Sequence, residues 1–317
     1  MSKNIPSKIA ILVNKSARQG TAGKEWSRIR KEVLNYFPTK TLIIEYETPY
    51  DIDKALENMY LNEGVDGFVS AGGDGSINIV LNALMNLKDK FKKQFFLGGI
   101  ALGSSNDFVK PSKTWINSIP IKIDWKNNQL TDLGFISFKD INGNKTTKYF
   151  LINASLGITA QANYLFNKPN KILAKLKQYW VQGAILYAAL KTILTYKSYD
   201  AILEYNGEKK AIELSNLAVI KSPYISGNLK YEQDIKCNDQ FFGLNYCDDL
   251  SRFDLVVTLY ELMKGKFKVS SKKKTFKIKS LGITPQDFVP IETDGEICLG
   301  KEIYFRVIPE EIYVMGN

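Results

Sequence analysis

The sequence predicts two domains, a doubly wound α/β domain followed by a second, mainly antiparallel β domain. Its 317 residues correspond to about two domains of ~150 residues each. In the first third of the chain, short apolar runs alternate with segments of helical periodicity, which is typical of a parallel sheet covered by helices. Beyond about residue 120, Asn-Gly dipeptides lie between strand-like runs instead, which is a hairpin signal.

The α/β domain is expected to contain four strands and three helices. Each strand is a short apolar run, as in strands that are buried on both faces. The four runs cover residues 8–13, 41–45, 67–71 and 95–102. Between them, apolar residues recur at helical spacing. These residues are Trp26, Ile29, Val33, Leu34 and Phe37 in the first helix, Ile52, Ala55, Leu56 and Met59 in the second, and Ile77, Val80, Leu81 and Leu84 in the third.

The second domain is expected to contain two hairpins, which turn at Asn142-Gly143 and at Asn206-Gly207. The paired runs are 133–138 with 149–153 and 201–205 with 211–214. A long helical stretch, residues 170–196, separates the two hairpins. Further strands are expected at 215–221, 241–246, 253–258 and 275–279, and the runs at 303–308 and 312–315 fit either domain.

The composition excludes several classes of protein. With 44% hydrophobic and 24% charged residues, the chain is typical of globular proteins and is neither wholly disordered nor collagen-like. Histidine is absent, which removes every catalytic triad and every zinc site that depends on it. A proton acceptor must therefore be a carboxylate, a lysine, a tyrosine or a cysteine.

Cysteine usage and hydropathy indicate a cytoplasmic protein. Cys237, Cys247 and Cys298 form an odd set without a C-x-x-C pair, so neither a disulfide framework nor a zinc ribbon is expected. No signal peptide is visible, and the most apolar stretch, residues 179–196, falls short of a clean membrane span. We expect a protein that is soluble or attached peripherally to the inner face of the membrane.

The net charge favours anionic partners. The 43 Lys+Arg and 33 Asp+Glu give a formal charge of +10, which suits nucleotides, nucleic acid or an anionic membrane surface. The only basic run, residues 272–274, is short and is interpreted as a solvated turn. No nucleic-acid partner is therefore expected.

A Gly-rich segment follows the third predicted strand. It comprises Gly72, Gly73, Asp74, Gly75 and Ser76, and a helix is expected to begin near Ser76. Glycines at such a place let the backbone approach a polyphosphate, and the N–H groups of the loop and the helix N-terminus bind anions. Asp74 would repel phosphate unless a cation were present, so an Asp-held Mg²⁺ that bridges phosphate oxygens is the expected arrangement.

A second polar loop, residues 103–108 (GSSNDF), follows the fourth strand. Since the carboxyl ends of neighbouring parallel strands meet at one edge of the sheet, both loops are expected at the edge where such folds bind ligands. A third segment, Asp294-Gly295-Glu296, lies near the C-terminus and by itself predicts only a β-turn.

These segments together resemble the diacylglycerol kinase catalytic-domain family, the bacterial soluble lipid kinases that are related to sphingosine and ceramide kinases. Residues 72–78 (GGDGSIN) are similar to the GGDGTxN motif of the family, residues 103–108 to its GTxNDF motif, and residues 294–296 to its late DGE motif. Asp132-Leu133-Gly134 resembles the entry into the second domain. Asn14, residues 20–24 and Thr48 resemble the nucleotide-binding positions after the first two strands.

The resemblance implies a nucleotide-binding α/β domain, residues 1–132, and a β-sandwich lipid-substrate domain, residues 133–302. The last strands, about 303–317, are expected to return to the first domain. The implied cofactors are ATP and Mg²⁺. The implied nucleotide-binding residues are Asn14, Thr48, Gly72, Gly73, Asp74, Gly75, Ser76, Asn78, Gly103, Ser104 and Asn106.

The implied catalytic residues are Glu296, as the acceptor of the proton from the lipid hydroxyl, and Asp294 beside it. The implied metal ligands are Asp74, Asp107, Asp132 and, in a separate structural site, Asp239. The chain departs from the family pattern at several places. Ser76 replaces the threonine of GGDGT, Ile79 replaces an acidic residue, and the glycine of the turn that follows Asp239 is missing.

The sequence therefore predicts an ATP- and Mg²⁺-dependent lipid kinase that phosphorylates a hydroxyl of diacylglycerol or a similar lipid at a membrane surface. Two alternatives stay open. One is an NAD kinase-like phosphotransferase with a soluble acceptor, and the other is a non-catalytic nucleotide-binding regulator derived from the lipid kinases. The sequence is compatible with a homodimer and does not determine the oligomeric state.

Overall fold

The computed structural model describes residues 4–38, 40–48, 50–168 and 170–317. The chain divides into two compact units. Unit 1 comprises the chain up to Thr131 together with Glu310–Asn317, and unit 2 comprises Asp132–Pro309. The assignment of a nucleotide role and a lipid role to separate parts of the chain remains a prediction.

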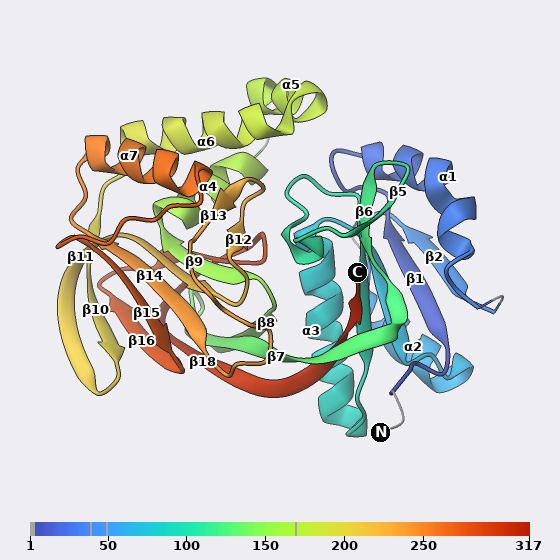
Figure 1. The fold of residues 1–317 in the computed structure, drawn as a ribbon. Helices are drawn as coiled ribbons and strands as arrows, with labels where there is room; N and C mark the ends of the chain where they lie inside the picture. Colours follow the sequence, from blue (N-terminus) through green and yellow to red (C-terminus); the bar gives the residue numbers. More distant parts are fainter. Residues whose placement is uncertain (1–3, 39, 49, 169) are drawn as a thin grey trace. The chain divides into compact units, whose positions relative to one another are not determined.

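The sheet of unit 1 confirms the four predicted strands (Figure 1). Strands β1 (Ile9–Asn14), β2 (Leu42–Tyr46), β3 (Gly67–Gly72) and β4 (Phe96–Ala101) are parallel and lie in the order β4-β3-β1-β2. All residues of β1, β3 and β4 are buried, as their continuous apolar sequence predicts. The end of β18 (Glu296–Gly316) adds a short parallel pairing beside β4, through Tyr313 and Val314.

Three helices connect these strands, as predicted: α1 (Thr21–Leu34), α2 (Ile52–Glu63) and α3 (Asp74–Phe91). Helix α3 begins at Asp74, two residues before the expected start. A 3₁₀ turn (Asp107–Val109) and a small hairpin of β5 (Thr114–Ile116) and β6 (Ile119–Lys122) follow β4 and were not predicted.

The strand order of unit 1 reverses between β1 and β3. The chain crosses from β1 to β2 in one direction along the sheet and from β3 to β4 in the other. Because such crossovers are right-handed, α1 covers one face of the sheet and α3 the other. Folds of this class bind ligands at the carboxyl ends of the strands between which the order reverses, here β1 and β3.

Unit 2 is a β-sandwich, as expected. Its strands are β7 (Asp124–Asp140, from Asp132 on), β8 (Lys145–Phe150), β9 (Asn153–Gly157), β10 (Tyr199–Tyr205), β11 (Glu208–Ile220), β12 (Tyr224–Ile225), β13 (Leu229–Lys230), β14 (Phe242–Asp248), β15 (Lys273–Ile278), β16 (Ser280–Pro285), β17 (Val289–Thr293) and the first part of β18. Both Asn-Gly turns are confirmed, since Gly143 and Gly207 have φ values of 82° and 80° and join antiparallel strands.

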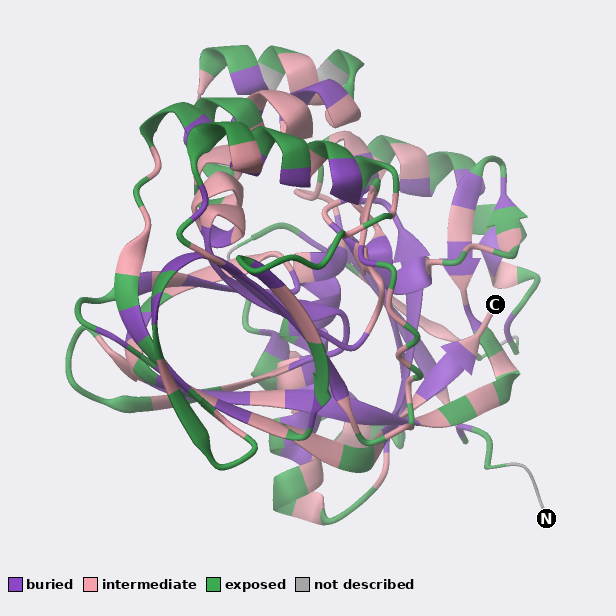
Figure 2. Cartoon of the chain, turned by 60° about the vertical axis from the view of Figure 1, so that its left-hand side comes forward, coloured by how far each residue is buried: buried purple, intermediate pink, exposed green. Residues whose placement is uncertain are grey.

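The core of unit 2 depends on two strands that pair along different parts of their length. Strand β11 pairs with β10 up to Leu214 and with β9 from Asn216 on, and a bulge separates the two stretches. Strand β18 likewise pairs first with β17 and then with β16. The strands curl around a buried apolar cluster, which appears purple in Figure 2 and includes Phe150, Phe242 and Phe305.

Four helices belong to unit 2: α4 (Ile158–Asn167), α5 (Lys171–Tyr179), α6 (Val181–Thr195) and α7 (Arg252–Met263). The single helix expected at 170–196 is broken at Trp180, whose φ of −152° is not helical. Gly183 accommodates this break, because a Cβ there would lie 2.2 Å from the Trp180 ring. Among the described residues, no helix combines the length and the apolarity that a membrane span requires.

One strand prediction is wrong. Residues 253–258, which are rich in β-branched and aromatic side chains, lie in helix α7. The helix begins with a capping box in which Ser251 and Asp254 bond to each other's backbone N–H groups. The S-x-x-D spacing signals a helix start, and this local signal outweighs the β propensity of the side chains that follow.

Candidate functional site

The segments that follow β1, β2 and β3 in unit 1 are joined by side-chain hydrogen bonds. Asn14, the last residue of β1, donates from Nδ2 to Oγ of Ser76 at 2.9 Å, and both residues are buried. Oδ1 of Asn14 accepts the N–H of Ser16 at 3.0 Å, and the Ser16 hydroxyl accepts the N–H of Thr48 at 3.1 Å. These bonds connect the predicted positions after β1, β2 and β3.

The two Gly-containing loops lie against each other without side chains between them. A Cβ at Gly103 would lie 2.2 Å from Cα of Gly73, and a Cβ at Gly72 would lie 2.6 Å from Oγ of Ser76. No other residue type fits at these positions unless the backbone shifts. Gly75 and Asn78 follow in the first turns of α3.

The carboxylate of Asp74 fixes the second loop to the first. Its Oδ1 accepts the N–H of Phe108 at 3.0 Å, in a buried environment. Within the second loop, Oδ1 of Asn106 accepts the N–H of Gly103 at 2.9 Å, and its Nδ2 donates to the Gly103 carbonyl at 3.1 Å. Ser104, which lies between Gly103 and Asn106 in the sequence, is half-buried. Hydrogen bonds of Ser76, Asp74 and Asn106 thus connect the segments that follow β1, β3 and β4.

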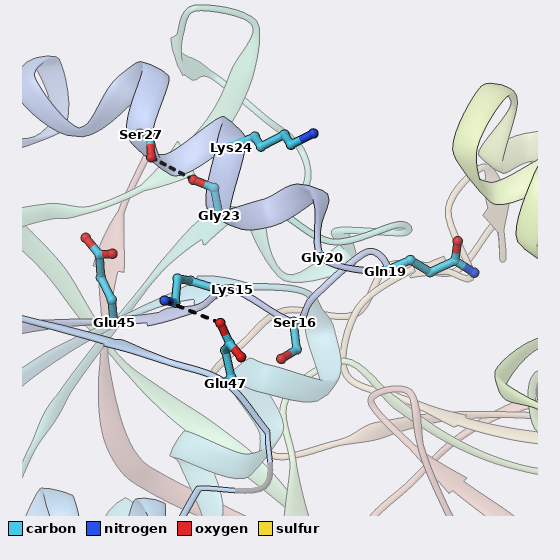
Figure 3. Close-up of a pocket in the computed structure, with 9 residues that line it drawn as sticks. All are labelled: Lys15, Ser16, Gln19, Gly20, Gly23, Lys24, Ser27, Glu45 and Glu47. Atoms are coloured by element: carbon cyan, nitrogen blue, oxygen red, sulfur yellow. Dashed lines mark hydrogen bonds and ion pairs between the residues drawn. The ribbon is translucent and has the colours of Figure 1, made fainter.

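A polar cavity of about 740 Å³ lies between the loop after β1, the start of α1 and the end of β2 (Figure 3). Lys15, Ser16, Gln19, Gly20, Gly23, Lys24, Ser27, Glu45 and Glu47 line it. Figure 3 shows Lys15 directed toward Glu47, with 3.5 Å between the ammonium and the carboxylate, and Lys24 extending from the start of α1. Sequence reasoning marked residues 20–24 as part of a nucleotide loop but did not identify the acidic wall formed by Glu45 and Glu47.

The carboxylates of unit 1 fit a magnesium ion that takes most of its ligands from phosphate and water. Asp74 and Asp107 are both buried on the two adjacent loops, and Asp107 also pairs with Lys110 at 2.7 Å. The described residues contain no group of three or more acidic or cysteine side chains that could hold a metal ion. Mg²⁺ in phosphate-transfer sites typically uses one or two carboxylates together with substrate phosphates.

In unit 2, the Asp294-Gly295 dipeptide forms the tight turn between β17 and β18. Both residues have positive φ, 46° and 95°. The Asp294 carboxylate is buried and accepts three consecutive backbone N–H groups, those of Leu151, Ile152 and Asn153, at 2.8–3.0 Å. It anchors the turn to the segment between β8 and β9. Glu296, the first residue of β18, is half-buried beside this anchored turn.

Glu292, which the sequence analysis did not identify, also holds this turn in place. Its carboxyl group accepts the N–H of Gly295 at 2.6 Å, Nδ2 of Asn153 at 2.8 Å and the hydroxyl of Ser155 at 2.7 Å. Burial raises the pKa of Glu292 to about 8, against the opposing effect of these hydrogen bonds. Its position two residues before Asp294 was the only sequence signal.

Asp132 and Asp239 lie together in unit 2, with a lysine ammonium between them. Nζ of Lys221 is 3.2 Å from Asp132 and 3.3 Å from Asp239, and it also donates to the carbonyls of Lys236 and Phe241. Although burial raises the pKa of Asp239, the N–H groups of Lys236 and Phe241 and the Lys221 ammonium hold it below its usual value. Because the Lys221 ammonium occupies the space between them, the two carboxylates do not fit a metal ion.

Comparison with known proteins agrees with this architecture. The family model described as "Diacylglycerol kinase catalytic domain" matches residues 8–122, and "YegS C-terminal NAD kinase beta sandwich-like domain" matches residues 153–316. Proteins named diacylglycerol kinase from Staphylococcus epidermidis and Staphylococcus haemolyticus are 25% and 24% identical to this chain. The first alignment covers 79% of this chain and 72% of the relative, and the second covers 84% and 81%.

Two solved structures from Bacillus anthracis share the fold. One has a TM-score of 0.74 at 19% identity, and the alignment covers 100% of this chain and 97% of the solved chain. The other, described as a diacylglycerol kinase, has a TM-score of 0.68 at 17% identity, with 99% and 98% covered. The two family models, which together match most of the chain, show that it belongs to the diacylglycerol kinase catalytic-domain family of bacterial lipid-kinase-like proteins.

Proposed function

We propose that this protein is an ATP- and Mg²⁺-dependent lipid kinase, which transfers the γ-phosphate of ATP to a hydroxyl of diacylglycerol or a similar lipid. The observation that carries the proposal is the buried bond from the Phe108 N–H to Asp74, which ties two Gly-containing loops together at the carboxyl edge of a parallel sheet. Family membership supports the reaction class, and the lipid acceptor is an inference from the names of the relatives.

The loops of unit 1 suit a polyphosphate. Gly72, Gly73, Gly75 and Gly103 have no side chain that would keep a phosphate away from the backbone, and the N-terminus of α3 adds the positive end of a helix dipole. When bound, Mg²⁺ would neutralise charge on the phosphate oxygens, and Asp74 and Asp107 are the residues that would hold it. Asn14 and Ser76, which bond to each other, would orient the loop beneath the phosphates.

The acceptor hydroxyl needs a base only while the phosphoryl group is being transferred. Because the chain has no histidine, a carboxylate is the natural candidate, and we assign this role to Glu296. Asp294 is a positioning residue in this scheme. Its carboxylate is engaged by three backbone N–H groups, so it holds the turn that presents Glu296.

Phosphate transfer from γ-labelled ATP to a panel of lipids in mixed micelles tests the proposal. The panel should contain diacylglycerol, ceramide and a monoacylglycerol, with NAD as a soluble acceptor and Glu296→Gln as the matched inactive control. We expect the wild type to transfer labelled phosphate to one of the lipids and Glu296→Gln to transfer none. Label in NAD alone would support a soluble phosphotransferase, and nucleotide binding without any transfer would support a regulator.

A further inference from the structure

Helix α7 is apolar on two sides, although unit 2 buries only one of them. Leu255 and Leu262 face the interior and are 6% and 5% exposed. On the opposite side, five apolar residues recur at the spacing of a single helix face and are 36–76% exposed: Phe253, Val256, Val257, Tyr260 and Met263. A helix that is apolar all round is normally covered on both sides by protein or by lipid.

Helix α6 lies beside α7 and also carries exposed apolar residues (Figure 1). Leu190 and Leu194 of α6 are 41% and 66% exposed, and at the break before α6 Tyr179 and Trp180 are 82% and 61% exposed. We call these nine residues of α5–α7 the outer apolar face. Figure 2 colours the exposed residues of these helices green along the ribbon. Large exposed apolar side chains gathered on neighbouring helices mark an interaction site.

The charges on the helices that carry the outer apolar face are mainly positive. Residues 171–199 contain five lysines and no Asp or Glu. Of these, Lys171, Lys175, Lys191 and Lys197 are exposed. At the two ends of α7, Arg252, Lys264, Lys266 and Lys268 are also exposed. The helix has two acidic residues: Asp254 is half-buried in the capping box with Ser251, and Glu261 is buried in a pair with Lys273. The apolar face is therefore bordered by cations.

We infer that the outer apolar face docks on an anionic lipid bilayer, with Phe253, Tyr260 and Trp180 inserted among the acyl chains and headgroups. Tyr and Trp suit this depth because their rings are apolar while their N–H or O–H groups bond to water or headgroups. Each lysine near an anionic membrane contributes about 1 kcal/mol of attraction. The choice of a bilayer rests on the proposed function, since a lipid acceptor must be reached at a membrane.

The main competing occupant is a second copy of this chain. A two-fold interface would place the same surface on both partners and bring the bordering lysines of one copy against those of the other. Like charges across an interface are unfavourable, whereas the same lysines attract phosphatidylglycerol. The charge pattern therefore favours lipid over self-association.

Sedimentation with vesicles of phosphatidylcholine and phosphatidylglycerol, which contain no acceptor lipid, tests docking separately from catalysis. We expect binding that rises with phosphatidylglycerol and falls by at least about tenfold in the double variant Phe253→Ser/Tyr260→Ser, because two aromatic side chains no longer enter the membrane. The matched control is Ile141→Ser, which removes an apolar side chain that is 62% exposed on a turn outside the face. It should bind as the wild type does.

Two further measurements separate this proposal from its competitors. Quenching of tryptophan fluorescence by brominated lipid should be strong in the wild type and largely lost in Trp180→Phe, which retains Trp26, Trp115 and Trp125. Sedimentation velocity without lipid should show no dimer that depends on Phe253.

Vesicle binding that is equal in the wild type and the double variant would overturn the docking face, and a dimer abolished by the double variant would assign the face to self-association. Absence of kinase activity alongside intact vesicle binding would overturn the proposed function only.

Discussion

The ammonium of Lys221 lies 3.2 Å from the carboxylate of Asp132, and both side chains are shielded almost completely from solvent, at 1% and 0% exposure. A second carboxylate, Asp239, lies 3.3 Å from the same nitrogen. The pair of acidic residues that the family resemblance assigns to metal thus already has an internal cation. Removal of one partner of a buried ion pair leaves the other charge uncompensated, so this cluster is sensitive to single substitutions.

We expect Lys221→Met to destabilise the protein by about 3–5 kcal/mol, because two carboxylates lose the charge between them. The control is Lys277→Met, since Lys277 is 3.9 Å from Asp239 and 45% exposed and should contribute at most about 1 kcal/mol. Chemical denaturation gives both values. A loss in Lys221→Met no larger than in the control would show that the ion pair is not maintained in solution.

Removal of the whole side chain in Lys221→Ala leaves two carboxylates and two carbonyls around a vacated position. Such oxygen ligands suit a divalent cation, so millimolar Mg²⁺ or Ca²⁺ should restore part of the lost melting temperature. The nucleotide-free wild type should melt at the same temperature with Mg²⁺ or with EDTA. An increase for the wild type that Asp239→Asn abolishes would mean that a metal ion binds beside Lys221.

Asp74→Asn should abolish productive use of Mg·ATP while the fold survives. The amide oxygen of asparagine can still accept the Phe108 N–H, but it cannot balance a cation beside a polyphosphate. Lipid phosphorylation and the melting temperature are measured together, with the exposed Asp89→Asn as control. Full activity in Asp74→Asn would remove the metal role from this residue.

Gly103→Ala should weaken nucleotide binding by at least about tenfold, because the added Cβ would lie 2.2 Å from Cα of Gly73 and must separate the two loops. Gly282→Ala is the matched control, since its Cβ would meet nothing closer than 3.5 Å. Calorimetric titration with ATP measures the nucleotide affinity of both variants. Equal affinities would indicate that the close approach of the loops does not matter for nucleotide binding.

Glu296→Gln should lower kcat by about 10²–10⁴, the usual contribution of a general base. The affinity for ATP should hardly change, because the lost interaction belongs to the transition state. Glu302→Gln, on the same strand and exposed, is the control. If Glu296→Gln retains nearly full turnover, Glu296 is not the base.

The pH dependence of stability should report on Glu292. The pKa of this group is raised from 4.5 to about 8, so between these values the folded state binds more protons than the unfolded state. Stability of the wild type relative to Glu292→Gln should therefore fall as the pH rises from about 5 to 8 and become constant above that. A tenfold change in a proton-binding constant corresponds to about 1.4 kcal/mol, so a fall of a few kcal/mol is expected. Parallel stability curves for the two proteins would place the pKa near its ordinary value.

The sequence by itself determined the features that depend on neighbouring residues. Continuous apolar runs predicted the buried strands of unit 1, Asn-Gly dipeptides predicted two hairpin turns, and Gly-rich segments after β3 and β4 predicted loops that meet at one sheet edge. Motif order then indicated the family. Where two local signals competed, as at residues 253–258, the strand prediction failed because the Ser251–Asp254 cap was not recognised.

Only the tertiary structure decided which polar groups meet. Asp74 bonds to Phe108 across 34 residues of chain, Asp294 bonds to Ile152 across 142, and Asp132 meets Lys221 across 89. Pairings over such distances depend on strand order and register, which no local pattern specifies. The same is true of the outer apolar face, because a run of apolar residues has the same appearance in sequence whether its helix is covered or exposed. Burial is a property of the packed chain. The importance of Glu292 and Lys221, which depends on their burial, could therefore not be recognised from the sequence.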